Sequence, residues 1–233
     1  MRNRIILTLT LIVSFCGFSL AAFAQASLDT TMSDFFQNSI AEKSTIYVGR
    51  FYKPYSKYKS KSNAFFGSEE WYESSLTYNE NQYSVKLRYE LVSDKVLTPG
   101  IDETNSIELT NEKVNSFKID GHYFINLNEN LPDYMNPGFY EVIYDGQYSF
   151  LSRRKKKVKE IIVDLELQYE FIETVEYFLG ANNKFTKVSG LNKLLSQFPD
   201  KKGKIKKNLS DNDINFNRNR EQALKAIGAL INN

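Results

Sequence analysis

The sequence is poor in the residues that build metal sites and disulfides. It contains one cysteine, Cys16, and one histidine, His122, among 233 residues. A structural zinc site needs four ligands, most often cysteine and histidine, and a disulfide needs two cysteines. These counts exclude a disulfide framework and any metal site rich in cysteine or histidine. We therefore expect no metal and no cofactor.

Motifs of the common enzyme classes are missing as well. Neither phosphate-binding loop, G-x-G-x-x-G or G-x-x-x-x-G-K-[ST], occurs, and no serine lies in a G-x-S-x-G elbow. His122 directly follows a hairpin signal at 120–121, which is typical of a structural or solvent-facing histidine. We predict a protein that is not an enzyme. A hydrolase is the weaker alternative, because three acidic pairs could supply its two carboxylates: Glu69–Glu70, Asp102–Glu103 and Glu166–Glu170.

The longest apolar run lies at the N-terminus and has the three parts of a secretory signal peptide. Positive charge at 2–4 precedes an apolar run over 5–21, and "AFA" at 22–24 has the small residues that a signal peptidase requires. We predict a signal peptide over residues 1–24, cleaved between Ala24 and Gln25. A retained membrane anchor is the alternative, but no positive stop-transfer flank follows the run. The mature protein is then exported, periplasmic or associated with the outer membrane, and has no transmembrane segment.

The net charge of +2 belongs to this leader. The chain has 30 basic and 28 acidic residues, and removal of Arg2 and Arg4 leaves 28 of each. A neutral protein has no global field that attracts polyanions, so we expect no nucleic-acid partner. Cys16 is removed with the leader, which leaves the mature chain without a thiol.

Alternation of apolar and polar residues predicts an antiparallel β-rich body over residues 25–188. The strongest strand covers 83–91, where apolar side chains alternate with Lys86, Arg88 and Glu90 on the opposite face. The preceding "NENQ", at 79–82, predicts a turn.

Further strands and turns continue this pattern. Asp120-Gly121 and Asp145-Gly146 are strong hairpin signals, and the loop 128–138, with two prolines, is expected to be irregular. The stretch 158–179 fits both helical spacing and strands; we predict a strand only at its end. The remaining predicted strands are 74–78, 106–109, 114–119, 122–127, 139–144, 147–153, 174–179 and 184–188.

The character of the chain changes at residue 189. Ser189 can cap a helix that carries a leucine stripe and ends at Pro199, and 217–231 predicts a final amphipathic helix. We expect the C-terminal segment, 189–233, to pack its apolar faces on the β body within one structural domain. The predicted fold is mainly β with α: an antiparallel meander, as a curved sheet, half-barrel or sandwich, followed by small helices.

Two stretches rich in basic residues are the candidate binding patches. "FYKPYSKYKSK", at 51–61, carries Tyr52, Tyr55 and Tyr58, whose rings can stack on sugars or line an interface. The second stretch has six basic residues between 153 and 159. In an extended strand these charges alternate between both faces, which is typical of a solvated strand end and not of a groove that reads nucleic acid. Contact with anionic envelope lipid or an acidic protein is the alternative, with these candidates: Arg153, Arg154 and Lys156.

Several segments together resemble one family. They are "IYVGRFYKPY", "FFGSEEWYESSLTYNENQYSVKLRYELVSDKVL", "VNSFKIDGHYF", "PGFYEVIYDGQYSFLSRRKKKVKE" and "GLNKLLSQFPDKKGKIKKNL". The combination resembles exported proteins of Bacteroidota that have no known activity, although members often carry a glycine in the turn that is "YNENQY" here. The resemblance implies a Gram-negative envelope location and brings no catalytic residues.

The expected function follows from these absences and patches. We predict an exported, non-enzymatic binding or assembly accessory whose partner is an envelope protein or an anionic envelope lipid. A periplasmic carrier of lipids or lipoproteins, with an apolar cavity, is the main alternative.

Overall fold

The computed structural model describes residues 46–55, 62–101, 104–182 and 184–233. The predicted cleavage site at Ala24–Gln25 and the candidate Tyr58 lie outside these residues. All of the strands and helices below belong to one unit, which the chain forms from residue 49 to residue 233.

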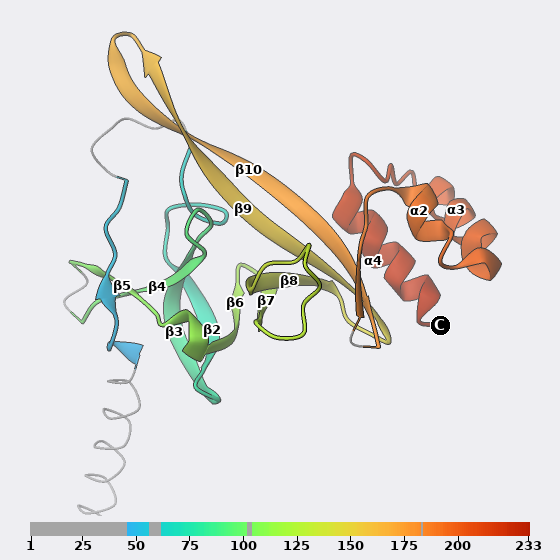
Figure 1. Ribbon diagram of the computed structural model, residues 1–233, viewed down its shortest axis with the longest axis horizontal. Helices are drawn as coiled ribbons and strands as arrows, with labels where there is room; N and C mark the ends of the chain where they lie inside the picture. Colours follow the sequence, from blue (N-terminus) through green and yellow to red (C-terminus); the bar gives the residue numbers. More distant parts are fainter. Residues whose placement is uncertain (1–45, 56–61, 102–103, 183) are drawn as a thin grey trace, which may run out of the picture. The chain divides into compact units, whose positions relative to one another are not determined.

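Within the described residues, eleven antiparallel strands form one sheet in the order β1-β5-β4-β3-β2-β6-β7-β8-β9-β10-β11 (Figure 1). From β6 to β11 each strand pairs with the next along the chain, as in a meander. One connection, from β5 to β6, returns the chain to the free edge of β2. The strands are β1 (Arg50–Phe51), β2 (Tyr72–Tyr78), β3 (Asn81–Glu90), β4 (Lys95–Pro99), β5 (Ser106–Glu108), β6 (Val114–Ile119), β7 (His122–Leu127), β8 (Gly138–Tyr144), β9 (Tyr148–Val163), β10 (Glu166–Ala181) and β11 (Lys184–Lys187).

Helices follow the sheet, which confirms the predicted fold class. The helix α4 (Arg220–Ile231) places Leu224 and Ile227 in one buried cluster with Phe150 of β9 and Leu179 of β10. This helix therefore packs on the sheet. The N-cap of helix α2 (Leu191–Leu195) is Gly190 and not, as predicted, Ser189. The remaining helical elements are η1 (Asn111–Lys113), η2 (Pro199–Lys201) and α3 (Lys202–Asp211).

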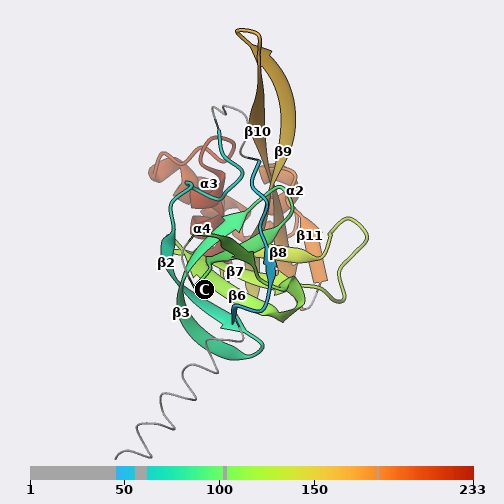
Figure 2. The same ribbon diagram turned by 90° about the vertical axis from the view of Figure 1, so that its left-hand side faces the viewer.

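The stretch 158–179, which fitted two periods in the sequence, is strand throughout except at its turn. It lies in the β9–β10 hairpin, whose two 16-residue strands pair from Tyr148–Ala181 to Val163–Glu166. Figures 1 and 2 both show this hairpin projecting beyond the neighbouring strands. Helical spacing was the wrong interpretation, because β-branched residues and a two-residue turn at 164–165 favour a ribbon.

The turn of this hairpin contains an exposed leucine in the left-handed region. Leu165 has φ 64° and is 99% exposed. The equivalent position is Gly121, φ 78°, in the β6–β7 hairpin. An L-residue with a side chain is strained in this region, whereas glycine is not.

Replacing Leu165 with Gly is therefore expected to raise the free energy of unfolding by about 0.5–1 kcal/mol, since strain is relieved and no packing is lost. Urea denaturation measures the change. The reverse substitution, Gly121→Leu, is the matched control and should destabilise by a similar amount. A loss of stability in Leu165→Gly would contradict the strain argument.

Candidate functional site

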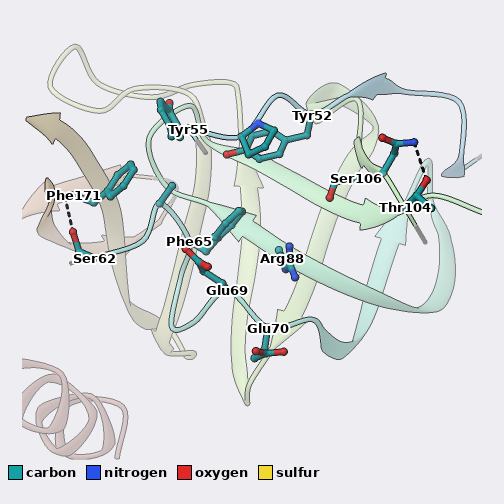
Figure 3. Close-up of a pocket in the computed structure, with 13 residues that line it drawn as sticks. Tyr52, Tyr55, Ser62, Phe65, Glu69, Glu70, Arg88, Thr104, Ser106 and Phe171 are labelled. Atoms are coloured by element: carbon teal, nitrogen blue, oxygen red, sulfur yellow. Dashed lines mark hydrogen bonds between the residues drawn. The ribbon is translucent and has the colours of Figure 1, made fainter. Parts of the chain in front are cut away.

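A pocket of about 700 Å³ opens on the face of the sheet that carries the side chain of Arg88 (Figure 3). Segments far apart in the sequence build it: the chain after β1, the segment before β2, strand β3, the start of β5, and β10. Figure 3 shows Phe171 and Ser62 at one end and Thr104 and Ser106 at the other, with Phe65 and Arg88 between them. The pocket is therefore elongated.

Aromatic rings form much of its wall. The ring of Tyr52 meets Phe65 edge-on at 6.1 Å between centroids, and Tyr55 meets Phe171 in the same way at 5.4 Å. Edge-to-face contacts of this kind hold each ring in a fixed orientation. The wall is thus a rigid aromatic surface contributed by the chain after β1, by the segment before β2 and by β10.

Backbone hydrogen bonds hold the wall against the sheet. The amide of Tyr52 donates to the carbonyl of Ser106 at 2.8 Å, and the amide of Phe66 donates to the carbonyl of Tyr89 at 2.8 Å. The ammonium of Lys156 donates to the Phe65 carbonyl at 2.6 Å. The aromatic residues are therefore positioned by the sheet itself.

Arg88 is held in the pocket by rings. Its guanidinium carbon lies 4.0 Å from the ring centroid of Trp71 and 5.5 Å from that of Phe65. Its Nε is buried and has no hydrogen-bond partner in the part of the chain that the structure describes. Burial lowers the pKa of Arg88, although Glu70 and Glu69 oppose this shift.

The tyrosines of the pocket remain neutral phenols. Burial raises the pKa of Tyr52, and the negative charge of Glu90 raises it further. Burial also raises the pKa of Tyr55. At neutral pH both hydroxyls keep their protons, so they can act as hydrogen-bond donors and not as general bases.

Two carboxylates, those of Glu69 and Glu70, stand in the wall of the pocket on exposed residues. The turn that carries them is fixed by Ser68, whose Oγ accepts from the Glu70 amide at 3.1 Å and lies 2.9 Å from the hydroxyl of Tyr72. Of the three acidic pairs noted in the sequence, this one lies in the pocket. Asp102–Glu103 falls outside the described residues.

Tyr52 and Tyr55, two of the candidate binding residues, line the pocket, and their role in binding stays a prediction. Arg153, Arg154 and Lys156 do not line it, and for these three side chains the interpretation as a solvated strand end was wrong. Arg153 is 4% exposed and its Nη2 lies 2.6 Å from Oδ2 of Asp94.

Arg154 and Lys156 also have partners inside the chain. Arg154 donates from Nε to Glu141 at 2.8 Å and also contacts Glu173 and Glu221. Burial lowers the pKa of Lys156, whose ammonium is bound by backbone carbonyls. These three side chains act inside the fold, and a role for them in binding stays a prediction.

Glu90 and His122 both hydrogen-bond within the chain. Glu90, predicted on the face opposite the apolar residues of its strand, is fully buried, and its carboxylate accepts from the amides of Val92 and Ser93 at 2.7 and 2.8 Å. His122, the single histidine, lies with Nδ1 2.5 Å from Oε1 of Glu141.

Sequence reasoning missed Arg88 as a site residue because it misplaced one turn. The turn before β3 has two residues, Asn79 and Glu80, and not the predicted four. A four-residue turn would have placed Arg88 opposite Glu73, as an ordinary surface pair. The observed register, which pairs Tyr72 with Leu87, continues to Trp71 beside Arg88.

The chain matches no known protein family, no curated protein and no solved structure. Among the described residues, no three His, Cys, Asp or Glu side chains lie together in a way that could hold a metal ion. No helix within the same residues has the length and apolar character that crossing a membrane requires.

Proposed function

We propose that this protein is an exported envelope binding protein whose elongated pocket takes a saccharide ligand. The observation that carries the proposal is the combination in one pocket of fixed rings, Tyr52, Tyr55, Phe65 and Phe171, with hydrogen-bonding groups. Aromatic faces pack on the C–H faces of sugars, while polar groups bind the hydroxyls. The volume of about 700 Å³ lies in the range of small-ligand sites. The envelope location rests on the predicted signal peptide.

This ligand class suits the pocket better than an acyl chain does. Three ionisable side chains, those of Arg88, Glu69 and Glu70, share the pocket with the rings. An acyl chain would remove water from these groups and offer them no hydrogen bonds in return, which costs free energy. A carrier of lipids is therefore less well supported than a saccharide-binding protein.

Tyr55→Ala is expected to weaken saccharide binding about 30-fold, because it removes the ring that packs against Phe171 in the wall. Isothermal titration calorimetry against a panel of oligosaccharides measures the change. Tyr123→Ala is the matched control, since Tyr123 is a 45% exposed tyrosine on β7 that does not line the pocket. Equal losses in the two variants, or no binding by the unaltered protein, would contradict the proposal.

A hydrolase is the second candidate, favoured by the presence of Glu69 and Glu70 in the same pocket. Release of reducing ends from the bound oligosaccharide, abolished in the double variant Glu69→Gln/Glu70→Gln, would identify this activity. Binding without release would leave the binding protein as the function.

A further inference from the structure

Arg88 differs from Arg153 and Arg154, two other arginines shielded from solvent, in its contacts with carboxylates. Arg153 is paired with Asp94, and Arg154 with Glu141, Glu173 and Glu221. Among the described residues no carboxylate forms an ion pair with Arg88, and its guanidinium rests on the rings of Trp71 and Phe65 instead. Arg88 is thus a partly buried positive charge that no carboxylate of the described residues pairs with directly, although Glu69 and Glu70 line the same pocket.

Arg88 keeps donors for an external carboxylate. A guanidinium that lies on aromatic rings can still hydrogen-bond through the N–H groups at its edge. Nε of Arg88 is buried and has no hydrogen-bond partner among the described residues, so a ligand in the pocket would bind the terminal Nη groups instead. A carboxylate would accept from these Nη groups in the bidentate geometry that suits arginine.

Glu69 and Glu70 limit how much negative charge the ligand can carry. Both lie close enough to Arg88 to favour its charged form. They repel a second anionic group, yet their oxygens can accept hydrogen bonds from sugar hydroxyls. The chemistry of the pocket therefore fits one acidic sugar next to neutral sugars.

We infer that the ligand is an acidic saccharide, and that Arg88 binds the carboxylate of a single uronic acid unit while Tyr52, Tyr55 and Phe171 contact the adjoining sugars. This inference rests on the proposed function, because it names the ligand class of the same pocket. It makes Arg88 the residue that determines specificity for acidic over neutral saccharides.

The protein carries its own reporter for this test. Trp71 is the single tryptophan of the chain, and Arg88 stacks on it. A carboxylate that binds Arg88 changes the electrostatic surroundings of that indole, so tryptophan emission should respond to the ligand. Calorimetry gives a second readout that does not depend on Trp71.

The experiment titrates the purified protein with a panel of aldobiouronic acids, each a uronic acid linked to a neutral sugar, and with their carboxyl-reduced counterparts. The acidic member of the recognised pair should bind about 10- to 100-fold more tightly than its reduced form. Arg88→Gln should abolish this preference. Arg88→Lys should retain part of it, because lysine keeps the positive charge but lacks the parallel N–H donors of the guanidinium. Glu70→Gln should tighten binding of the acid by up to about fivefold.

The possible failures are distinguishable. If the acidic and reduced sugars bind equally, and Arg88→Gln changes neither, the inference about charge is wrong while saccharide binding stands. If no pair binds the unaltered protein by either readout, the proposed function is wrong as well. A native circular dichroism spectrum for Arg88→Gln, with the same unfolding midpoint as the unaltered protein, shows that a lost preference does not come from a lost fold.

Discussion

Replacement of Glu141 with glutamine is expected to lower the free energy of unfolding by about 3–5 kcal/mol. Glu141 is 3% exposed and lies at the centre of a buried network on β8. Its carboxylate accepts from Nε of Arg154 at 2.8 Å and from the Ser152 hydroxyl at 2.9 Å, and it lies 2.5 Å from Nδ1 of His122. Glutamine keeps the shape but leaves the buried side of Arg154 without its negative charge.

The matched control removes a second carboxylate from the same arginine. Glu173 contacts Arg154 at 3.0 Å but is 35% exposed. Water replaces much of its interaction, so Glu173→Gln should cost less than about 1 kcal/mol. Urea denaturation compares the two variants, and equal effects would show that burial does not set the strength of this network.

The same network predicts a dependence on pH. Burial alone would raise the pKa of Glu141, but the hydrogen bond from His122 and the charge of Arg154 outweigh it and hold the pKa below its usual range. A lowered folded-state pKa contributes stability above the unfolded pKa, about 4.3, and this stability is lost as the pH falls through the folded pKa. The difference in unfolding free energy between the unaltered protein and Glu141→Gln should therefore shrink below about pH 4.

Gly138→Ala is expected to destabilise the protein by about 4 kcal/mol, for two reasons that act together. Gly138 has φ 132°, a conformation that residues with a Cβ rarely adopt. A Cβ at this position would also overlap with the Asp94 carboxylate and the Arg153 guanidinium. The methyl group would thus separate the ion pair between Asp94 and Arg153, whose Oδ2 and Nη2 atoms lie 2.6 Å apart. The same carboxylate also accepts a hydrogen bond from the Tyr89 hydroxyl at 2.6 Å.

Gly121→Ala separates backbone strain from the loss of the ion pair. Gly121 has φ 78°, but a Cβ there would meet nothing within 4 Å. Its replacement should cost only the strain, about 1 kcal/mol. Thermal or urea denaturation measures both variants, and a loss at Gly138 no larger than that at Gly121 would contradict a role for the Asp94–Arg153 pair in stability.

Local turn chemistry explains which parts of the fold were predicted well. Asp120-Gly121 predicted a hairpin with strands over 114–119 and 122–127, and β6 and β7 have these bounds. The final helix, predicted over 217–231, runs over Arg220–Ile231. Such signals depend on residues that are neighbours in the chain, so they predict local structure without knowledge of the rest of the fold.

The β9–β10 hairpin shows where alternation of apolar and polar residues no longer predicts a strand. Alternation identifies a strand when one face is buried and the other meets water. The outer part of this hairpin pairs only within itself, and Ile162 and Leu165 are exposed near its tip. Near the tip no continuous buried face selects apolar residues, so the sequence over 158–179 carried a mixed period.

Distant parts of the chain determine how far Arg153 and Arg154 are buried and which carboxylates they contact. Arg153 meets Asp94, 59 positions away, and Arg154 meets Glu221, 67 positions away. Strand alternation specifies the face on which a charge lies but not what covers that face. The solvated interpretation was the reasonable local expectation, and long-range packing overturned it.

The sequence by itself determined the antiparallel strands with most of their hairpins, and the final helix. It did so because strand alternation, turn chemistry and helical spacing are local properties. Only the tertiary structure decided that Arg88 lies beside Trp71 in a pocket, since one turn length sets that register and five separate segments build the wall. Long-range pairing and burial, not residue type, placed Arg88 in the pocket and enclosed Arg153 and Arg154.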